Sequence, residues 1–221
     1  MRHVAQACRL QRNPLCKALQ ARTPALRVLA AGAILVNLAL CACGTPPQEH
    51  FYTLASDPLP QRATTATTST YTVVVGPVTV PELVDRPQLV VRTSPTRVDI
   101  VELARWAAPL KSEIPRVVAD QLARLLDGAH TSSSWERTAG APDYRVLIDI
   151  HRFESAPQEG ATVQASWTIS SRDGTSIGGQ SAVTEAAGGA GYDALVAAHS
   201  RALASISRDI AAAISDARKT R

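Results

Sequence analysis

Thr162-Val-Gln-Ala-Ser-Trp-Thr-Ile-Ser170 is the most regular segment of this 221-residue sequence. Apolar and polar residues alternate along it, as in a β-strand whose successive side chains point to opposite faces of a sheet. We expect the inward face to carry Val163, Ala165, Trp167 and Ile169, and the outward face to meet solvent. Asp173-Gly174 follows, a pair typical of a tight hairpin turn. The segment 176–186 is therefore predicted to return as the partner strand.

Further apolar runs upstream of this hairpin predict more strands. Tyr144–Ile150 alternates in the same way, with Tyr144, Val146, Ile148 and Ile150 on its inner face. Shorter strands are predicted at 50–54, 71–75 with a continuation at 78–81, 88–92 and 98–101. Those within 71–101 lie so close in sequence that a β-meander or a pair of hairpins is the simplest arrangement. The polar segments 55–70 and 131–142 are predicted to be loops.

Two segments have the periodicity of amphipathic helices. In the first, Ile114, Val117, Val118, Leu122, Leu125 and Leu126 form one stripe. Ser112 is its expected N-cap, which would place Pro115 in the first turn, and Gly128 is its expected C-terminal glycine. The second helix, 192–217, has a stripe of Leu195, Val196, His199, Leu203, Ile206, Ile210 and Ile214. Together these elements predict one α/β domain with a mixed, mostly antiparallel sheet, one or both faces of which are covered by two long helices.

The segment 1–42 has the features of a bacterial lipoprotein signal peptide. It carries six basic residues and no acidic one, and residues 28–42 form an uncharged, mostly apolar run. That run is shorter than the roughly 20 residues a helix needs to cross a bilayer, so a cleaved export signal fits better than a membrane span. Leu40-Cys41-Ala42-Cys43 matches the lipobox pattern and makes Cys43 the lipid acceptor, whereas Cys41 follows the bulky Leu40. The leader is long, which leaves the true translation start open.

Removing this leader changes the net charge and the cysteine content of the chain. The mature chain would hold 17 Lys and Arg against 19 Asp and Glu, so the basic character of the full sequence gives no support to nucleic-acid binding. All four cysteines lie at or before position 43, so no disulfide and no thiolate metal site is expected. Gly44 follows the acceptor where Asp would retain a lipoprotein in the inner membrane under the enterobacterial rule. We therefore expect the periplasmic face of the outer membrane, with 43–70 a lipidated N-terminus and linker and 71–217 the folded domain.

The sequence shows no recognisable catalytic or cofactor motif. It contains no nucleophile elbow, phosphate loop, dinucleotide fingerprint or H-E-x-x-H. The five histidines have no metal-ligand spacing, and His199 is interpreted as a semi-buried residue of the helix stripe. His151 and Glu154 could form an acid–base pair, but ordinary polar residues at a strand end explain them better. A non-enzymatic protein without cofactor is predicted.

Two loops carry candidate partner-binding residues. The segment 76–87 combines three prolines with charges that a core does not need, among them Asp85 and Arg86. Stiff loops on a sheet are common contact sites. The alternative is that Arg86 only pairs with a nearby carboxylate at the surface. Trp135, in the second polar loop, is the third candidate, whereas Trp106 and Trp167 are expected to be buried.

Several segments in this order resemble one known family: His50-Phe-Tyr-Thr-Leu54 after a lipidated cysteine, 73–81, Asp85-Arg-Pro-Gln-Leu-Val-Val-Arg92, Arg105-Trp-Ala-Ala-Pro-Leu110, and 144–153 with Trp167. They are similar to the PqiC family of ABC-type transport auxiliary lipoproteins over 43–216. The resemblance implies a TolB N-terminal-like α/β sandwich and no catalytic residues. It also implies an outer-membrane lipoprotein that works with a mammalian-cell-entry (MCE) protein and, in many members, an ABC permease and ATPase that move lipids between membranes.

Two other functions remain as alternatives. One is a stand-alone envelope lipoprotein that binds an amphiphile, and the other is a cell-wall hydrolase, which the lack of a catalytic set disfavours. The sequence leaves open which lipid is moved, in which direction, and whether the chain forms a homo-oligomer.

Overall fold

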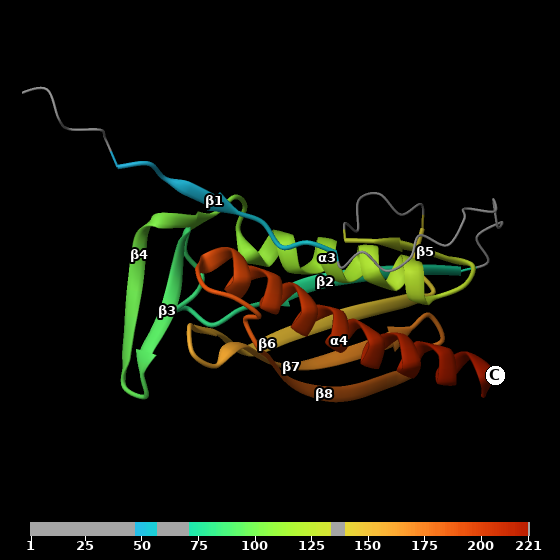
Figure 1. Cartoon of the computed structure of the whole chain (residues 1–221). Coiled ribbons are helices and arrows are strands. Elements are labelled where there is room, and N and C mark those ends of the chain that lie inside the picture. The colour runs from blue at the N-terminus through green and yellow to red at the C-terminus, as the bar shows by residue number, and fades with distance from the viewer. Residues whose placement is uncertain (1–46, 57–70, 134–139, 221) are drawn as a thin grey trace, which may run out of the picture. The chain divides into compact units, whose positions relative to one another are not determined.

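The computed structural model of the chain describes residues 47–56, 71–133 and 140–220. The predicted leader, Cys43, Gly44, most of the 55–70 segment and Trp135 lie outside these ranges. From Gln48 onward the described residues belong to one compact unit. In it, a single mixed sheet of eight strands packs against two helices (Figure 1). The α/β architecture predicted from the sequence is confirmed.

The sheet contains parallel and antiparallel pairs. Its strands are β1 (His50–Tyr52), β2 (Tyr71–Thr79), β3 (Gln88–Ser94), β4 (Arg97–Trp106), β5 (Ala129–Ser132), β6 (Tyr144–Ala156), β7 (Gly160–Ser171) and β8 (Ser176–Glu185). Their order is β1-β4-β3-β6-β2-β5, and β7 joins β6 to β8. The longest pairings, β6 with β7 and β7 with β8, are antiparallel.

Strand β6 is the central strand of this sheet. One of its edges pairs with β7 along most of its length. The other edge pairs first with β2, from Tyr144 to Asp149, and then with β3 at Ser155. Because β6 has neighbours on both edges, it joins the β2–β5 part of the sheet to the β3–β4 hairpin.

The hairpin of β7 and β8 forms as predicted. The inward residues of β7 and of β6 are buried, and the outward residues of β7 are partly exposed. Gly174 adopts a φ of 89° and its N–H donates to the carbonyl oxygen of Ser171 at 3.0 Å, which closes the turn. This positive φ is easily adopted by glycine, which has no Cβ.

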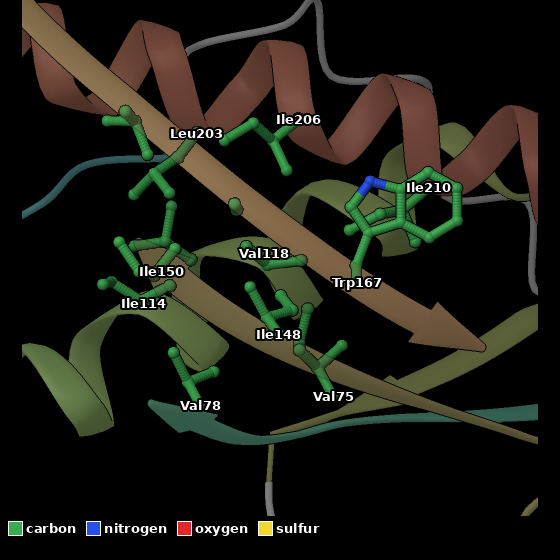
Figure 2. Close-up of a cluster of buried hydrophobic side chains, with 14 of the residues drawn as sticks. Val75, Val78, Ile114, Val118, Ile148, Ile150, Trp167, Leu203, Ile206 and Ile210 are labelled. Carbon is green, nitrogen blue, oxygen red and sulfur yellow. The ribbon is translucent and has the colours of Figure 1, made fainter. Parts of the chain in front are cut away.

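Both helices cover the same face of the sheet. They are α3 (Leu110–Leu125) and α4 (Tyr192–Lys219). Figure 2 shows Ile114 and Val118 of α3 and Leu203, Ile206 and Ile210 of α4 pointing toward Val75, Val78, Ile148, Ile150 and Trp167 of the strands. Each fully buried aliphatic side chain of this kind contributes about 1.5–3 kcal/mol. The opposite face carries polar residues such as Gln164, Ser166 and Gln180, so the helices cover one face, a point that the sequence had left open.

Of the two arrangements predicted for 71–101, the meander is wrong, and the pair of hairpins is right only for β3 and β4. The two runs around Gly76-Pro77 form one strand, β2, whose register with β6 shifts between Val75 and Val78. β6 lies between β2 and β3, which therefore do not pair. The reason is that β2 is buried along most of its length and needs a neighbour on each side. Parallel neighbours β5 and β6 become available only after the chain crosses back through α3. The predicted hairpin of β3 and β4 does form, and β4 extends to Trp106.

Two local predictions also need correction. Helix α3 begins at Leu110 with Pro109 as its N-cap and no capping side chain, so Ser112 is not the cap and Pro115 lies inside the helix. The N–H groups of Ser112 and Glu113 bond to the carbonyl oxygen of Pro109 at 2.8 and 3.0 Å, which replaces a side-chain cap. The second correction is β5, within a segment predicted partly as loop. Its short polar sequence gives no strand signal, and its pairing with β2 creates it.

Candidate functional site

The N-terminal segment, 48–56, is built into the folded unit at the edge of the sheet. His50, Phe51 and Tyr52 form β1, which pairs in parallel with Ala104, Arg105 and Trp106 at the end of β4. The N–H of Ala107 then donates to the carbonyl oxygen of Tyr52 at 2.7 Å. The strand predicted within 50–54 is thus confirmed over His50–Tyr52.

After β1 the N-terminal segment binds both helices. Leu54 is 1% exposed. The N–H of Leu54 and the hydroxyl of Thr53 donate to Glu113 Oε2 of α3 at 3.1 and 2.7 Å, and Arg116 Nη2 donates to the Leu54 carbonyl at 3.1 Å. The N–H of Ala55 donates to Ser200 Oγ of α4 at 3.1 Å. The path toward position 43 therefore starts from a fixed place on the domain.

The role of Glu113 was not predicted from the sequence. This carboxylate of α3 is mostly buried, where an acidic residue would be costly without partners. Hydrogen bonds from Thr53 and Leu54 and an ion pair with Arg116 satisfy it. An acidic residue beside the apolar stripe was the available signal, but its partners lie some sixty positions away.

The β3–β4 hairpin, which we call the arm, is joined to β6 by little backbone pairing. One register pair links Val91 of β3 to Ser155 of β6. Beside it, Arg92 Nε donates to Glu154 Oε2 at 3.0 Å, and the Arg92 Nη2 group contacts the other carboxylate oxygen. Arg152 also pairs with Glu154. Burial acts to raise the pKa of Glu154, but the hydrogen bonds and charges of the two arginines outweigh it and lower that pKa.

The exposed large hydrophobic side chains of the described residues gather in one part of the molecule. They are Phe51, Leu83, Ile100 and Leu103. Phe51 belongs to β1, Ile100 and Leu103 to β4, and Leu83 to the turn 81–87 that precedes β3. That turn is bonded to the end of β4, since the Trp106 N–H donates to the Pro87 carbonyl at 2.7 Å. Exposed apolar residues that share one part of a molecule suggest an interaction site more strongly than scattered ones do.

Of the predicted partner-binding residues, Asp85 and Arg86 lie in this turn but do not pair with each other in an ion pair. Asp85 Oδ2 lies 2.6 Å from Lys111 Nζ of α3, and both side chains are at least one-third exposed. Arg86 Nε is buried and has no hydrogen-bond partner among the described residues. The turn is thus fastened to α3 through Asp85. Trp135 lies outside the described residues.

A cavity of about 360 Å³ lies next to the Asp85–Lys111 pair. It is lined by residues 74–78 of β2, Lys111 and Pro115 of α3, Ser133 and Arg145. Apolar walls with two cationic side chains would suit a small amphiphile with an anionic group, and the volume is at the lower end of ligand pockets. Lys111 is already neutralised by Asp85.

The polar residues considered for catalysis have ordinary structural partners. His199 is fully buried, its ring stacks on Phe153 with centroids 3.9 Å apart, and its Nε2 lies 2.8 Å from Ser155 Oγ. Burial lowers the pKa of His199 to about 3, so the ring is neutral at physiological pH. His151 is exposed and bonds to Ser166, whereas Glu154 bonds to arginines. No group of three potential metal ligands occurs in the ranges that the structure describes.

Comparison with known proteins shows the family of this chain. A family profile described as "ABC-type transport auxiliary lipoprotein component" matches residues 52–211. The chain belongs to this family. The matched range begins at Tyr52, the last residue of β1, and includes the arm, α3 and most of α4. No curated protein matches the sequence.

Two solved structures share the fold of this family member. A crystal structure of an uncharacterized protein superposes with a TM-score of 0.64 at 19% identity, covering 76% of this chain and 99% of that one. Protein XCC0632 from Xanthomonas campestris, assigned to the DUF330 family, superposes with a TM-score of 0.54 at 19% identity, covering 73% and 92%. Within the described residues, no helix is long and apolar enough to cross a bilayer.

Proposed function

We propose that this auxiliary lipoprotein is a non-enzymatic component of an intermembrane lipid transport system. It is anchored through Cys43 in the periplasmic leaflet of the outer membrane and docks the MCE protein whose partners are an ABC permease and ATPase. Membership of the transport auxiliary family supports the general role. The outer-membrane address and the MCE partner are the additions of this proposal.

The observation that carries the proposal is the fixed N-terminal segment. Only seven positions separate Cys43 from His50, the first residue of β1. An extended chain covers at most about 25 Å over that distance. Because Leu54 and its neighbours bind both helices, the domain cannot swing away on the 57–70 linker. A domain held close to the membrane is well placed to bind the end of a periplasmic assembly that reaches this membrane.

The anchor is tested by two cysteine variants of the full chain. Cys43→Ser should accumulate as an unprocessed precursor without lipid, whereas Cys41→Ser should be processed normally. Metabolic labelling with a palmitate analogue reads the outcome, and label that persists in Cys43→Ser would exclude Cys43 as the acceptor. Gly44→Asp should shift the mature protein toward inner-membrane fractions if the organism follows the enterobacterial rule.

The docking role is tested at the turn that contains Asp85 and Arg86. The double variant Asp85→Ala/Arg86→Ala should reduce recovery of the MCE protein in pull-downs from detergent extracts. The matched control is Asp216→Ala/Lys219→Ala, which removes an exposed ion pair at the end of α4. Full recovery with a folded, lipidated Asp85/Arg86 variant would eliminate this turn and direct attention to Trp135.

The cavity favours one alternative, a lipoprotein that carries an amphiphile by itself. In that case the purified protein should contain about one bound lipid by native mass spectrometry. Ser133→Trp, at the lining, should displace it. Recovery of an MCE protein without bound lipid supports the adaptor instead.

A further inference from the structure

We propose that the outer side of the β1–β4 edge rests on the membrane surface, with Phe51 and Leu103 in the headgroup region. This inference rests on the lipid anchor of the proposed function. It adds a second attachment point and an orientation of the domain toward the bilayer.

The register of β1 and β4 places these two side chains together. Phe51 is paired with Arg105, and Leu103 lies two positions before Arg105 on the same strand. Side chains at neighbouring positions in register, and at i and i+2 along a strand, point to the same face. Phe51 is 63% exposed and Leu103 is 41% exposed. Ala104 and Trp106 point the other way and are buried.

Arg105 lies between the two apolar side chains and completes the surface. Its Nη2 pairs with Glu49 Oε1 at 3.1 Å, and its Nε donates to the carbonyl oxygen of Glu102 at 3.2 Å. An arginine with its aliphatic stem beside apolar residues and its charged end in a polar layer is common at membrane interfaces. The surface therefore combines two exposed apolar side chains with a paired arginine between them.

The length of chain before β1 indicates which surface covers this patch. Phe51 is eight positions from Cys43, so it lies at most about 28 Å from the acylated residue. On β6, Tyr144 pairs with Ser171 beside the β7–β8 turn, and Ser155 pairs with Val91 of the arm. These two positions are eleven residues apart, so the turn and the arm are separated by about 36 Å. The anchor thus keeps the β1 end close to the bilayer, and the apolar residues of that end are the ones available to enter it.

The energetics also fit a membrane contact. Insertion of a Phe and a Leu side chain to interfacial depth, about 5–10 Å, is individually weak. A tether of eight positions makes the contact intramolecular, so a weak interaction suffices to orient the domain. Acyl chains hold the protein on the membrane, and the β1–β4 edge selects which face of the domain looks toward the periplasm.

The test uses the absence of other free thiols from the mature chain. The cysteines of the sequence are at 8, 16, 41 and 43, so a cysteine introduced into the lipidated protein can be labelled alone. An environment-sensitive fluorophore is attached at Phe51→Cys, at Leu103→Cys, or at the control Ser176→Cys near the β7–β8 turn, where the residue is exposed. The full mature lipoprotein is reconstituted into vesicles of phosphatidylethanolamine and phosphatidylglycerol with or without a shallow doxyl-labelled phospholipid.

We expect the labels at 51 and 103 to show blue-shifted emission and to be quenched by the doxyl lipid, and the label at 176 to show neither. In a second variant, Phe51→Glu combined with the label at 103, most of the quenching should be lost. Circular dichroism confirms that each variant is folded.

Three outcomes would overturn the proposal, and they separate it from the anchor. Protein that floats with vesicles but shows no quenching at 51 keeps the anchor and removes the membrane contact. If the emission is blue-shifted but not quenched by the doxyl lipid, and the shift increases with protein density, a second copy of the chain covers the patch. Protein that does not float at all removes the anchor, and with it this inference.

Discussion

The arm and the β6–β7–β8 layer are made of the same kind of antiparallel hairpin but bury their apolar residues differently. In the β6–β7–β8 layer, the inward residues pack under α4, and even Trp167 has a hydrogen-bond partner, because its Nε1 donates to Ser181 Oγ at 3.2 Å. In the arm, Ile100 and Leu103 are exposed, and β3 meets β6 at one register pair. The inward apolar residues of the β6–β7–β8 layer are therefore buried by the chain itself, without a partner.

This difference indicates where the protein meets its surroundings. Helix α4 extends along the β7 and β8 strands, while Phe51 of β1 and Ile100 and Leu103 of β4 remain exposed. Apolar residues left in this position lower the stability of the isolated domain little, but they gain free energy when another surface covers them. The N-terminal segment links the two regions, since β1 belongs to the arm edge and Leu54 to the helical layer.

Leu54→Ala should have the largest effect on this comparison. Removing a fully buried leucine side chain costs about 3 kcal/mol. In a domain of this size that lowers the midpoint of thermal unfolding by about 10 °C. Phe51→Ala, three positions earlier but exposed, should change stability by no more than about 0.5 kcal/mol. Equal effects of the two variants, measured by thermal and chemical denaturation, would mean that the N-terminal segment does not dock as described.

Gly179→Ala should destabilise the β6–β7–β8 layer by about 2 kcal/mol. The new Cβ would lie 2.2 Å from Cζ2 of Trp167, whose ring is held by Ser181 and must move. The neighbouring Gly178 is the matched control. A Cβ at Gly178 meets the Trp167 carbonyl oxygen at an ordinary 3.8 Å, so Gly178→Ala should change stability by less than about 0.5 kcal/mol. Urea denaturation of both variants checks the difference, and similar midpoints would contradict the packing of Trp167 over Gly179.

Acidification should weaken the helical layer through His199. Its folded pKa is about 3 and the ordinary value is 6.5, so the unfolded chain binds a proton first as the pH falls. The contribution of His199 to the free energy of unfolding is fully present above pH 6.5 and falls below that pH. The loss is about 2 kcal/mol between pH 7 and pH 5. His199→Gln removes the titration and should flatten the stability profile over that interval. An identical slope in the two proteins would show that His199 is protonated in the folded state.

Glu154→Gln should have the smallest effect, and one confined to the arm. The Arg92–Glu154 pair is partly exposed, so its loss should cost about 1 kcal/mol. The lowered pKa of Glu154 means that its carboxylate contributes stability above the ordinary carboxyl range and loses it as the pH falls through the folded pKa. Hydrogen exchange should accelerate in β3 and β4 and stay unchanged in β7 and β8. Asp99→Asn, at the exposed Arg97–Asp99 pair, is the control and should leave the arm protected.

Local patterns in the sequence were enough for most elements. Alternation identified the faces of β6 and β7, and Asp173-Gly174 identified their hairpin to β8, because the period of two is a property of each strand alone. The stripes of α3 and α4 followed from the helical period in the same way. His199 was placed correctly on the buried side of α4, but the completeness of its burial depends on Phe153 and Trp106, which come from other strands.

The sequence by itself therefore determined the α/β class, the faces of the long strands, both helices, and the hypotheses of a Cys43 anchor and a family role. Only the tertiary structure decided that β6 separates β2 from β3, that Glu113 holds Leu54, and that Arg92 pairs with Glu154. It also showed Asp85 bonded to Lys111 and Phe51 beside Leu103. The physical reason is that periodicity and turn chemistry act over a few neighbouring residues. Sheet order and ion pairs join segments tens of positions apart, whose partners are fixed only when the whole core packs.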